Sequence, residues 1–465
     1  MRYPQPNMHR FFTYSPRNHY FEYSWYNLEL LRLLGSAPYG GCDAAEFLET
    51  VAQIKPNDAA SWQQRWLSLA ERTSGIAEEM IESGHINSAR GAYLRASNYF
   101  RCAQYLFPIM PVDDQAYLLH LYQKSISSFE KAMGLMPHEV RRVEIPFQAK
   151  DNRTIRLPGW LHLPNPSKLT ERSKAPVLIC VGGADSTQEE LYFLSVAEGP
   201  DLGYAVLTFD GPGQGLVLRR DGVPMEPHGE VVIGAVLDFI GTYAHEHPET
   251  QLDLESITLT GQSLGGFQAL RGSADQRVKA CVAVDPFYDM WDLAMARMPA
   301  WMFTPWANGW VGDWLIDWAA RAHGDQDIYT KYQFALAQRM FGTPNPGATL
   351  RAMKQYTFKL PDGKDYLSRV TCPVLVTAAA ADPTSFLPEL STNLIMKNLI
   401  NVAKGRKKLW VASAYSEGGA QAKSGAWPLL QHRVYRFLDE ALGIKRAKGD
   451  RIDGNLRRDS GGLDD

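Results

Sequence analysis

The fold is decided by the stretch Ile257-Thr258-Leu259-Thr260-Gly261-Gln262-Ser263-Leu264-Gly265-Gly266. Its apolar and β-branched start predicts a buried strand, and a helix-compatible stretch follows the last glycine. A Gly-x-Ser-x-Gly string between a strand and a helix puts its serine on a strained turn, where neighbouring side chains would collide with backbone. We therefore predict that Ser263 is an exposed nucleophile at the sheet edge. The backbone N–H of Leu264, at the start of the helix, is predicted to stabilise a developing oxyanion.

Two other loops are predicted to contribute to the same site. Gly183 and Ala184 follow the predicted strand 177–181 and are the candidates for a second oxyanion donor. Asp382 follows the predicted strand 374–378 and is the candidate acid in the chain order serine, acid, histidine. The alternatives are a plain glycine turn at the first position and a surface Asp-Pro turn at the second.

The loop that should supply a general base contains no histidine. It spans residues 413–424, after the predicted strand 409–412. The one histidine downstream of Asp382 is His432, in a predicted helix over 429–442, where it is expected to lie on the helix surface. Without a base, a serine stays protonated and is a poor nucleophile at neutral pH. Replacement bases are sought at His432, His228 and His323, in that order.

The rest of the chain predicts an α/β class. Residues 21–136 carry apolar side chains at helical spacing, and short β-branched runs alternating with helices begin near Val143. These 465 residues exceed the size of one hydrophobic core, so more than one domain is expected. Two leading antiparallel strands and six buried ones are predicted at 143–147, 159–163, 177–181, 205–209, 257–260, 278–284, 374–378 and 409–412.

The segment from Pro286 to about Asp365 contains no predicted strand but holds six of the chain's 12 tryptophans. They are Trp291, Trp301, Trp306, Trp310, Trp314 and Trp318. One interpretation is a helical insertion with its own small core, and the other is an aromatic lid over a pocket for a bulky apolar ligand. We also predict that Ser263 lies at the bottom of the main pocket, beneath the segment 291–318, because ligands of α/β proteins bind at the sheet edge where the serine turn lies.

Composition excludes several functions. A net charge of −3 and a pI near 6.4 give no basic footprint for nucleic acid or acidic lipid. The five cysteines, at 42, 102, 180, 281 and 372, are scattered and form no metal-binding pair, so buried reduced thiols are expected. No apolar run suits a membrane span, the stretch 1–17 lacks a signal-peptide pattern, and 445–465 is expected to be disordered. These features predict a cytoplasmic protein.

The motifs resemble those of a known family, the α/β-hydrolases related to dihydropseudooxynicotine hydrolase and the fermentation-respiration switch protein. The sequence is most similar to hydrolase-like proteins of fungal polyketide and polyketide-peptide gene clusters, of the fusarin and cytochalasan type. The resemblance spans about Gly35 to Leu442. It rests on residues 39–41, 54–62, 92–101, 182–190, 210–215 and 261–266.

The resemblance implies an α/β-hydrolase fold with a mostly parallel sheet, an N-terminal helical domain and an aromatic-rich helical lid insertion. The expected boundaries are 1–140 for the helical domain, 141–285 and 366–444 for the core, 286–365 for the lid and 445–465 for the tail. It also implies a homodimer, no cofactor or metal, Ser263 as nucleophile and Asp382 as acid. The family's histidine position falls on Ala422, or on Gln421 if the loop is shifted by one residue.

Two functional classes follow. In the first, the protein is an enzyme that acts on a carbonyl of a small polyketide-derived intermediate, by hydrolysis or by assisting cyclisation. The serine turn and the glycine loop favour this class. In the second, it is a degenerate hydrolase that binds such an intermediate, or a partner, without covalent chemistry, which the absent histidine favours. An oxyanion hole that polarises a carbonyl while the substrate's own nucleophile attacks would also need no histidine.

Overall fold

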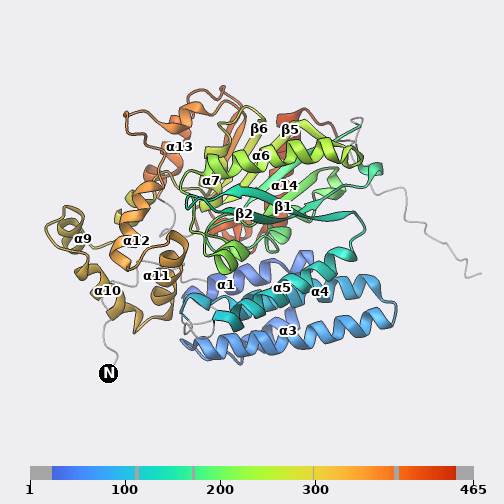
Figure 1. Ribbon diagram of the computed structural model, residues 1–465, viewed down its shortest axis with the longest axis horizontal. Helices are drawn as coiled ribbons and strands as arrows, with labels where there is room; N and C mark the ends of the chain where they lie inside the picture. The colour runs from blue at the N-terminus through green and yellow to red at the C-terminus, as the bar shows by residue number, and fades with distance from the viewer. Residues whose placement is uncertain (1–23, 110–114, 170–172, 297, 382–386, 447–465) are drawn as a thin grey trace, which may run out of the picture.

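An eight-stranded sheet lies at the centre of the computed structural model, which describes residues 24–109, 115–169, 173–296, 298–381 and 387–446 (Figure 1). The strand order is β1-β2-β4-β3-β5-β6-β7-β8. β1 and β2 pair antiparallel, β2 joins β4 antiparallel, and the remaining strands are parallel. The strands are β1 (Val140–Gln148), β2 (Thr154–His162), β3 (Ala175–Val181), β4 (Ala205–Phe209), β5 (Leu252–Gln262), β6 (Val278–Val284), β7 (Val374–Ala379) and β8 (Lys407–Ala412). Every strand predicted from the sequence is present.

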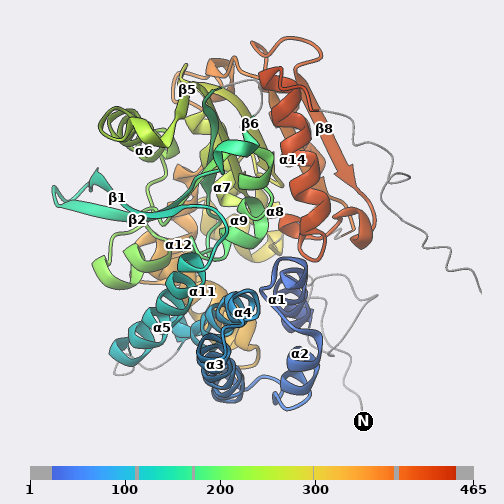
Figure 2. The ribbon, with the colours of Figure 1, turned by 90° about the vertical axis from the view of Figure 1, so that its right-hand side faces the viewer.

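Both faces of the sheet are covered by helices because its central strands are apolar on both sides. In β3, Val177 and Ile179 point into a core shared with α6 (Gly229–Glu246), α7 (Leu264–Gly272) and α13 (Thr392–Asn398). The alternate residues Leu178 and Cys180 point into a second core, shared with α14 (Trp427–Leu442). Figure 2 shows α14 running beside β8.

Five helices precede the sheet in the sequence and lie together on one side of it (Figures 1 and 2). They are α1 (Ser24–Gly35), α2 (Ala44–Val51), α3 (Ala59–Glu82), α4 (Ile86–Gln104) and α5 (Gln115–Gly134). Asp58 caps α3 by accepting the N–H of Ser61, a standard device for a helix start. The helices pack around a core that includes Trp62 and Trp66, so the helical spacing read from the sequence is confirmed.

Five more helices lie between β6 and β7: α8 (Met290–Ala296), α9 (Ala300–Ala307), α10 (Trp314–Gly324), α11 (Ile328–Phe341) and α12 (Pro346–Ala352). Phe303, Trp306, Ile316 and Leu350 form a small core of their own. Trp291 packs on Trp306, with ring centroids 5.6 Å apart. These contacts confirm the interpretation of an insertion with its own core.

The other four tryptophans of the insertion lie exposed on its surface. Trp301, Trp310, Trp314 and Trp318 are 79%, 76%, 66% and 64% exposed. The prediction of an aromatic lid is therefore wrong for them. It failed because a concentration of tryptophans in one segment does not show which surface their side chains face.

The remaining expectations from the sequence differ in outcome. All five cysteines are buried and free, as predicted. No helix among the described residues is long and apolar enough to span a membrane. The N-terminal stretch 1–17 lies outside the described residues, as does the predicted tail from residue 447 onward. The domain boundaries stay predictions.

Candidate active site

Ser263 lies between β5 and α7 in a conformation that non-glycine residues rarely adopt. Its φ is +53° and its ψ is −115°, and its N–H donates to the carbonyl of Val284 at 2.8 Å. A Cβ on Gly261 would lie 2.2 Å from the carbonyl oxygen of Gly265, and one on Gly265 would lie 2.2 Å from that of Val181. Glycine is therefore required on both sides of the serine, which holds Ser263 partly exposed at the carboxyl edge of the sheet.

Gln214 fixes the orientation of the glycine loop after β3 by holding two of its carbonyls. The Gln214 side chain donates to the carbonyl oxygens of Gly182 and Gly183 at 2.6 and 2.7 Å. The N–H and C=O of a trans peptide point in opposite directions, so the N–H groups of Gly183 and Ala184 point away from Gln214. Among the described residues, these two N–H groups and that of Leu264 have no backbone acceptor. No backbone carbonyl of the described residues therefore occupies the three predicted oxyanion donors.

Buried ion pairs fix the far end of the same loop. Asp185 follows Ala184 and accepts from Arg32 of α1 at 2.8 Å and from the Tyr105 hydroxyl at 2.7 Å. Arg32 also forms a bidentate pair with Glu190. Burial raises the pKa of Asp185, but the Arg32 charge and the Tyr105 hydroxyl outweigh it and lower that pKa below its ordinary value. The acidic residues of the 182–190 motif therefore hold the loop against α1.

The predicted acid, Asp382, lies outside the described residues, and its role stays a prediction. The chain leading to it is placed next to the loop that should carry a histidine. The N–H of Ala380 donates to the carbonyl of Ala412 at 2.8 Å, and that of Ala381 to the carbonyl of Gly419 at 3.2 Å. Residues 380–381 and the loop after β8 therefore meet at the carboxyl edge of the sheet.

The loop after β8 contains a buried lysine that the sequence analysis overlooked. Ala422 and Lys423 both have positive φ, 54° and 55°. The Lys423 side chain is 0% exposed, and its Nζ lies 2.8 Å from Asp285 Oδ1 and donates to the carbonyl of Ala378 at 2.9 Å. Thr377 donates to the same carboxylate oxygen at 2.6 Å. An ammonium group thus anchors the loop in which the family's histidine would stand.

This ion pair adjoins the serine turn through the backbone. Asp285 directly follows Val284, whose carbonyl accepts the N–H of Ser263. Gln421, one of the two residues aligned with the missing histidine, donates to the carbonyl of Asp285 at 3.3 Å. Burial lowers the pKa of Lys423, while the Asp285 carboxylate opposes that shift. A signal was present in the sequence, because Lys423 is the only charged residue between Gly418 and Trp427.

The histidines considered as replacement bases lie elsewhere. His432 is exposed on α14, as expected for a helix-surface residue. His228 stands at the start of α6 beside Arg271, with its Nδ1 3.4 Å from the guanidinium, and His323 lies near the end of α10. No histidine in the described parts of the chain is hydrogen-bonded to the Ser263 hydroxyl.

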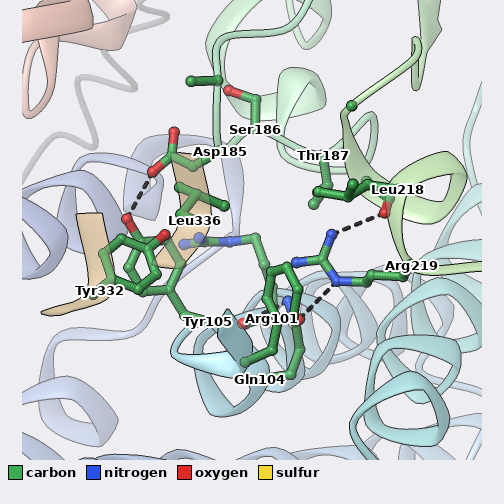
Figure 3. A pocket seen from close by; sticks show the side chains of 14 residues that line it. Arg101, Gln104, Tyr105, Asp185, Ser186, Thr187, Leu218, Arg219, Tyr332 and Leu336 are labelled. Carbon is green, nitrogen blue, oxygen red and sulfur yellow. Dashed lines mark hydrogen bonds between the residues drawn. The ribbon is translucent and has the colours of Figure 1, made fainter. Parts of the chain in front are cut away.

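A small cavity lies beside the glycine loop (Figure 3). Its volume is about 10 Å³, room for about one water molecule. Four parts of the chain form its wall: the α4 region with Arg101 and Tyr105, the glycine loop with Ala184, the segment 213–219, and α11 with Tyr332 and Leu336. Neither Ser263 nor a tryptophan lines it, contrary to the expected pocket. The cavity reaches the candidate oxyanion site through Ala184.

The fold and the serine turn, with the glycine loop beside it, indicate one class of protein. The chain belongs to the alpha/beta hydrolase family, whose profile matches residues 140–417. Among curated proteins it is 62% identical to the alpha/beta hydrolase ucsC of an Acremonium species, over 94% of this chain and 92% of that protein. It is 40% identical to the alpha/beta hydrolase gkaG of Penicillium citrinum, over 90% of this chain and 97% of the other. The family inferred from the motifs is confirmed.

Solved structures show the same fold. The structure of the 2,6-dihydroxy-pseudo-oxynicotine hydrolase matches 91% of this chain and 99% of its own, with a TM-score of 0.64 and 20% identity. The structure titled AbyA5 wild type covers 91% of this chain and 95% of its own, with a TM-score of 0.56 and 16% identity. Both alignments extend well beyond residues 140–417, so the likeness includes helices outside the family profile.

Proposed function

We propose that this protein is a serine-type α/β-hydrolase enzyme of fungal secondary metabolism. It acts on the carbonyl of a polyketide or polyketide-peptide intermediate in the cytoplasm, by hydrolysis or by assisting cyclisation. The observation that carries the proposal is the strained Ser263 turn, with the free amides of the glycine loop beside it. Backbone strain of this kind costs about 1–3 kcal/mol and persists at sites that use it.

The chemistry depends on Ser263 and on three backbone donors. A substrate carbonyl placed over Ser263 would develop negative charge on its oxygen as a nucleophile attacks. In this proposal the N–H groups of Leu264, Gly183 and Ala184, which have no backbone acceptor among the described residues, stabilise that charge. Either Ser263 attacks, with Asp382 supporting a base, or a group of the substrate attacks while the donors polarise the carbonyl. The second route suits a loop that carries Ala422 in place of histidine.

Replacing the serine separates these two routes. Ser263→Ala should abolish product formation if an acyl-enzyme forms, and only weaken it if the oxyanion donors carry catalysis. The substrate is found first, by deleting the gene in the host and identifying the metabolite that accumulates. Wild-type turnover by Ser263→Ala on that metabolite would remove the serine from the mechanism and contradict the proposal.

The absent histidine predicts weak general esterase activity. Loss of a triad member costs about 10⁴- to 10⁶-fold in turnover, so a fluorophosphonate probe should label the wild-type protein negligibly. Ala422→His, or Gln421→His for the shifted loop, should raise ester hydrolysis if the imidazole reaches the Ser263 hydroxyl. The matched control is Ala422→His combined with Ser263→Ala, which should return to the background rate. Strong labelling of the wild type would show a working triad with a base from another part of the chain.

The second candidate is a binding protein without covalent chemistry. The observation favouring it is that the loop aligned with the family's histidine is held by the ion pair between Lys423 and Asp285 and carries no histidine to act as a base. For this candidate, Ser263→Ala and the wild type should bind the accumulating metabolite equally, and neither should convert it. The same metabolite assay therefore decides between the two functions.

A further inference from the structure

Arg219 forms part of the cavity wall beside the glycine loop (Figure 3). It lies in a single π-helical turn, Val217–Asp221, and such turns are frequent at functional sites. Its Nη1 donates to the carbonyl of Gly215 at 2.9 Å, and its Nε donates to the side-chain oxygen of Gln104 at 3.1 Å. The guanidinium is therefore held in one orientation at the cavity.

Two aromatic rings flank the same guanidinium. Its central carbon lies 4.1 Å from the ring centroid of Phe107 and 4.6 Å from that of Tyr122. Aromatic faces attract a cation, and they do so more strongly where water is excluded. Burial accordingly lowers the pKa of Arg219, although Tyr122 and Asp210 oppose that shift. The rings hold the charge in place, but they do not neutralise it.

Arg219 differs from the other arginine of the cavity wall in having no direct counter-ion. Arg101 lies 3.3 Å from Glu29 and 3.8 Å from Glu190. Within the described ranges, no carboxylate lies within 4.0 Å of Arg219. Asp210 is separated from it by Tyr122, whose hydroxyl donates to that carboxylate at 3.3 Å. A partly buried cation is costly unless it is paired, so an unpaired one facing a cavity is suited to an anionic ligand.

We propose that Arg219 binds an anionic oxygen of the substrate, either a carboxylate or an enolate. A planar guanidinium suits such groups because it offers several donors in a fixed fork. Arg219 and Ala184 line the same cavity, so an anion held at Arg219 orients a nearby carbonyl toward the oxyanion donors. This inference rests on the proposed function, and it narrows the substrate to compounds that are acidic close to the reacting carbonyl.

The cavity is too small for a whole substrate, so side chains around it must move when a ligand binds. Its volume is about that of one water molecule, so in this proposal the cavity holds only the anionic head of a ligand. The rest of the ligand requires Tyr332 and Leu336 of α11 to move aside. Tyr332 is held by stacking on Tyr105, with centroids 4.9 Å apart. We therefore expect ligands to bind more slowly than diffusion allows.

The test compares a charged ligand with its neutral analogue of equal chain length. Sodium decanoate and 1-decanol are titrated into the full-length protein by calorimetry. The wild type should bind decanoate at least about tenfold more tightly than 1-decanol. Arg219→Gln should weaken decanoate binding by about tenfold or more and change 1-decanol binding by less than about twofold. Arg220→Gln is the matched control, since Arg220 is exposed in the same turn and paired with Asp221; it should bind both ligands like the wild type.

Two results would overturn the inference: equal affinity of the wild type for both ligands, or unchanged decanoate affinity in folded Arg219→Gln. If Arg219→Gln does not fold, Arg219→Lys decides, because it keeps the charge and must keep the preference for decanoate. Ser263→Ala should bind decanoate like the wild type. Failure of the proposed chemistry therefore leaves this result intact, and failure of anion binding leaves the Ser263 assays intact.

Discussion

Replacing Lys423 with methionine tests whether the loop after β8 is held by a buried charge. Methionine has a similar length but no ammonium group, so Lys423→Met removes the ion pair to Asp285 and the hydrogen bond to Ala378. Asp285 then keeps only the Thr377 hydroxyl at Oδ1, and its Oδ2 has no partner among the described residues. The variant leaves a buried carboxylate without a counter-ion.

The expected cost is large because both side chains are inaccessible. Lys423 and Asp285 are 0% and 3% exposed, and breaking a buried pair by removing one partner costs about 3–5 kcal/mol. Adding Asp285→Asn to Lys423→Met should recover more than half of that loss, since it removes the unpaired charge. Asparagine also tolerates the positive φ of 48° at position 285. The effects of the substitutions at positions 423 and 285 on the free energy of unfolding should therefore be strongly non-additive.

Urea denaturation of the wild type and the variants measures these energies. The control is Lys408→Met on the neighbouring strand, which breaks an exposed pair to Glu440 and should cost less than about 1 kcal/mol. A loss below about 1 kcal/mol for Lys423→Met would refute the reasoning, because it would mean that the ammonium does not neutralise Asp285. So would additive energies in the double variant.

Three further predictions concern other parts of the structure. Gly265→Ala puts a Cβ 2.2 Å from a backbone oxygen and should lower the free energy of unfolding by about 3 kcal/mol and abolish turnover, as denaturation and product assays would show. Burial and the Asp210 charge raise the pKa of Glu189 from 4.5 to about 7, so its stabilising contribution is complete below pH 4.5 and lost as the pH rises through about 7. Glu189→Gln should accordingly exceed the wild type in stability at about pH 8 but not below pH 4.5, and an equal difference at both pH values would contradict this. Trp306→Ala should destabilise the insertion by about 3–5 kcal/mol, whereas exposed Trp314→Ala should stay within about 0.5 kcal/mol of the wild type in the same denaturation assay.

The sequence predicted the sheet well because its strands are apolar runs bounded by turns. The predicted strands were shorter than the observed ones. An example is β5, which spans Leu252–Gln262, whereas the predicted apolar run covers 257–260. Hydrogen bonding continues there through polar residues that periodicity does not identify. The insertion was located, but the outward direction of its tryptophans depends on tertiary packing.

Prediction of the site was less complete. The serine turn was recognisable because local backbone geometry requires its glycines. A requirement of this kind appears in the sequence as a short motif. The Lys423–Asp285 pair was not recognisable because its members are 138 residues apart and meet only when β6 and β8 flank β7. The position of Arg219 was not recognisable either, since no motif marks it and the sequence does not show that it lies within 4.0 Å of no carboxylate among the described residues.

The ion pairs between Arg32 and the glycine loop limit where this chain can be recombined with its relatives. A chimera that exchanges the segment before β1 keeps Asp185 and Glu190 from one parent and takes the residue at position 32 from the other. If that residue is not an arginine, half-buried Asp185 loses its cation and buried Glu190 loses its bidentate partner, beside the candidate oxyanion donors. Crossover points in a shuffled library should therefore carry α1 and residues 182–190 from the same parent, although about 150 residues separate them.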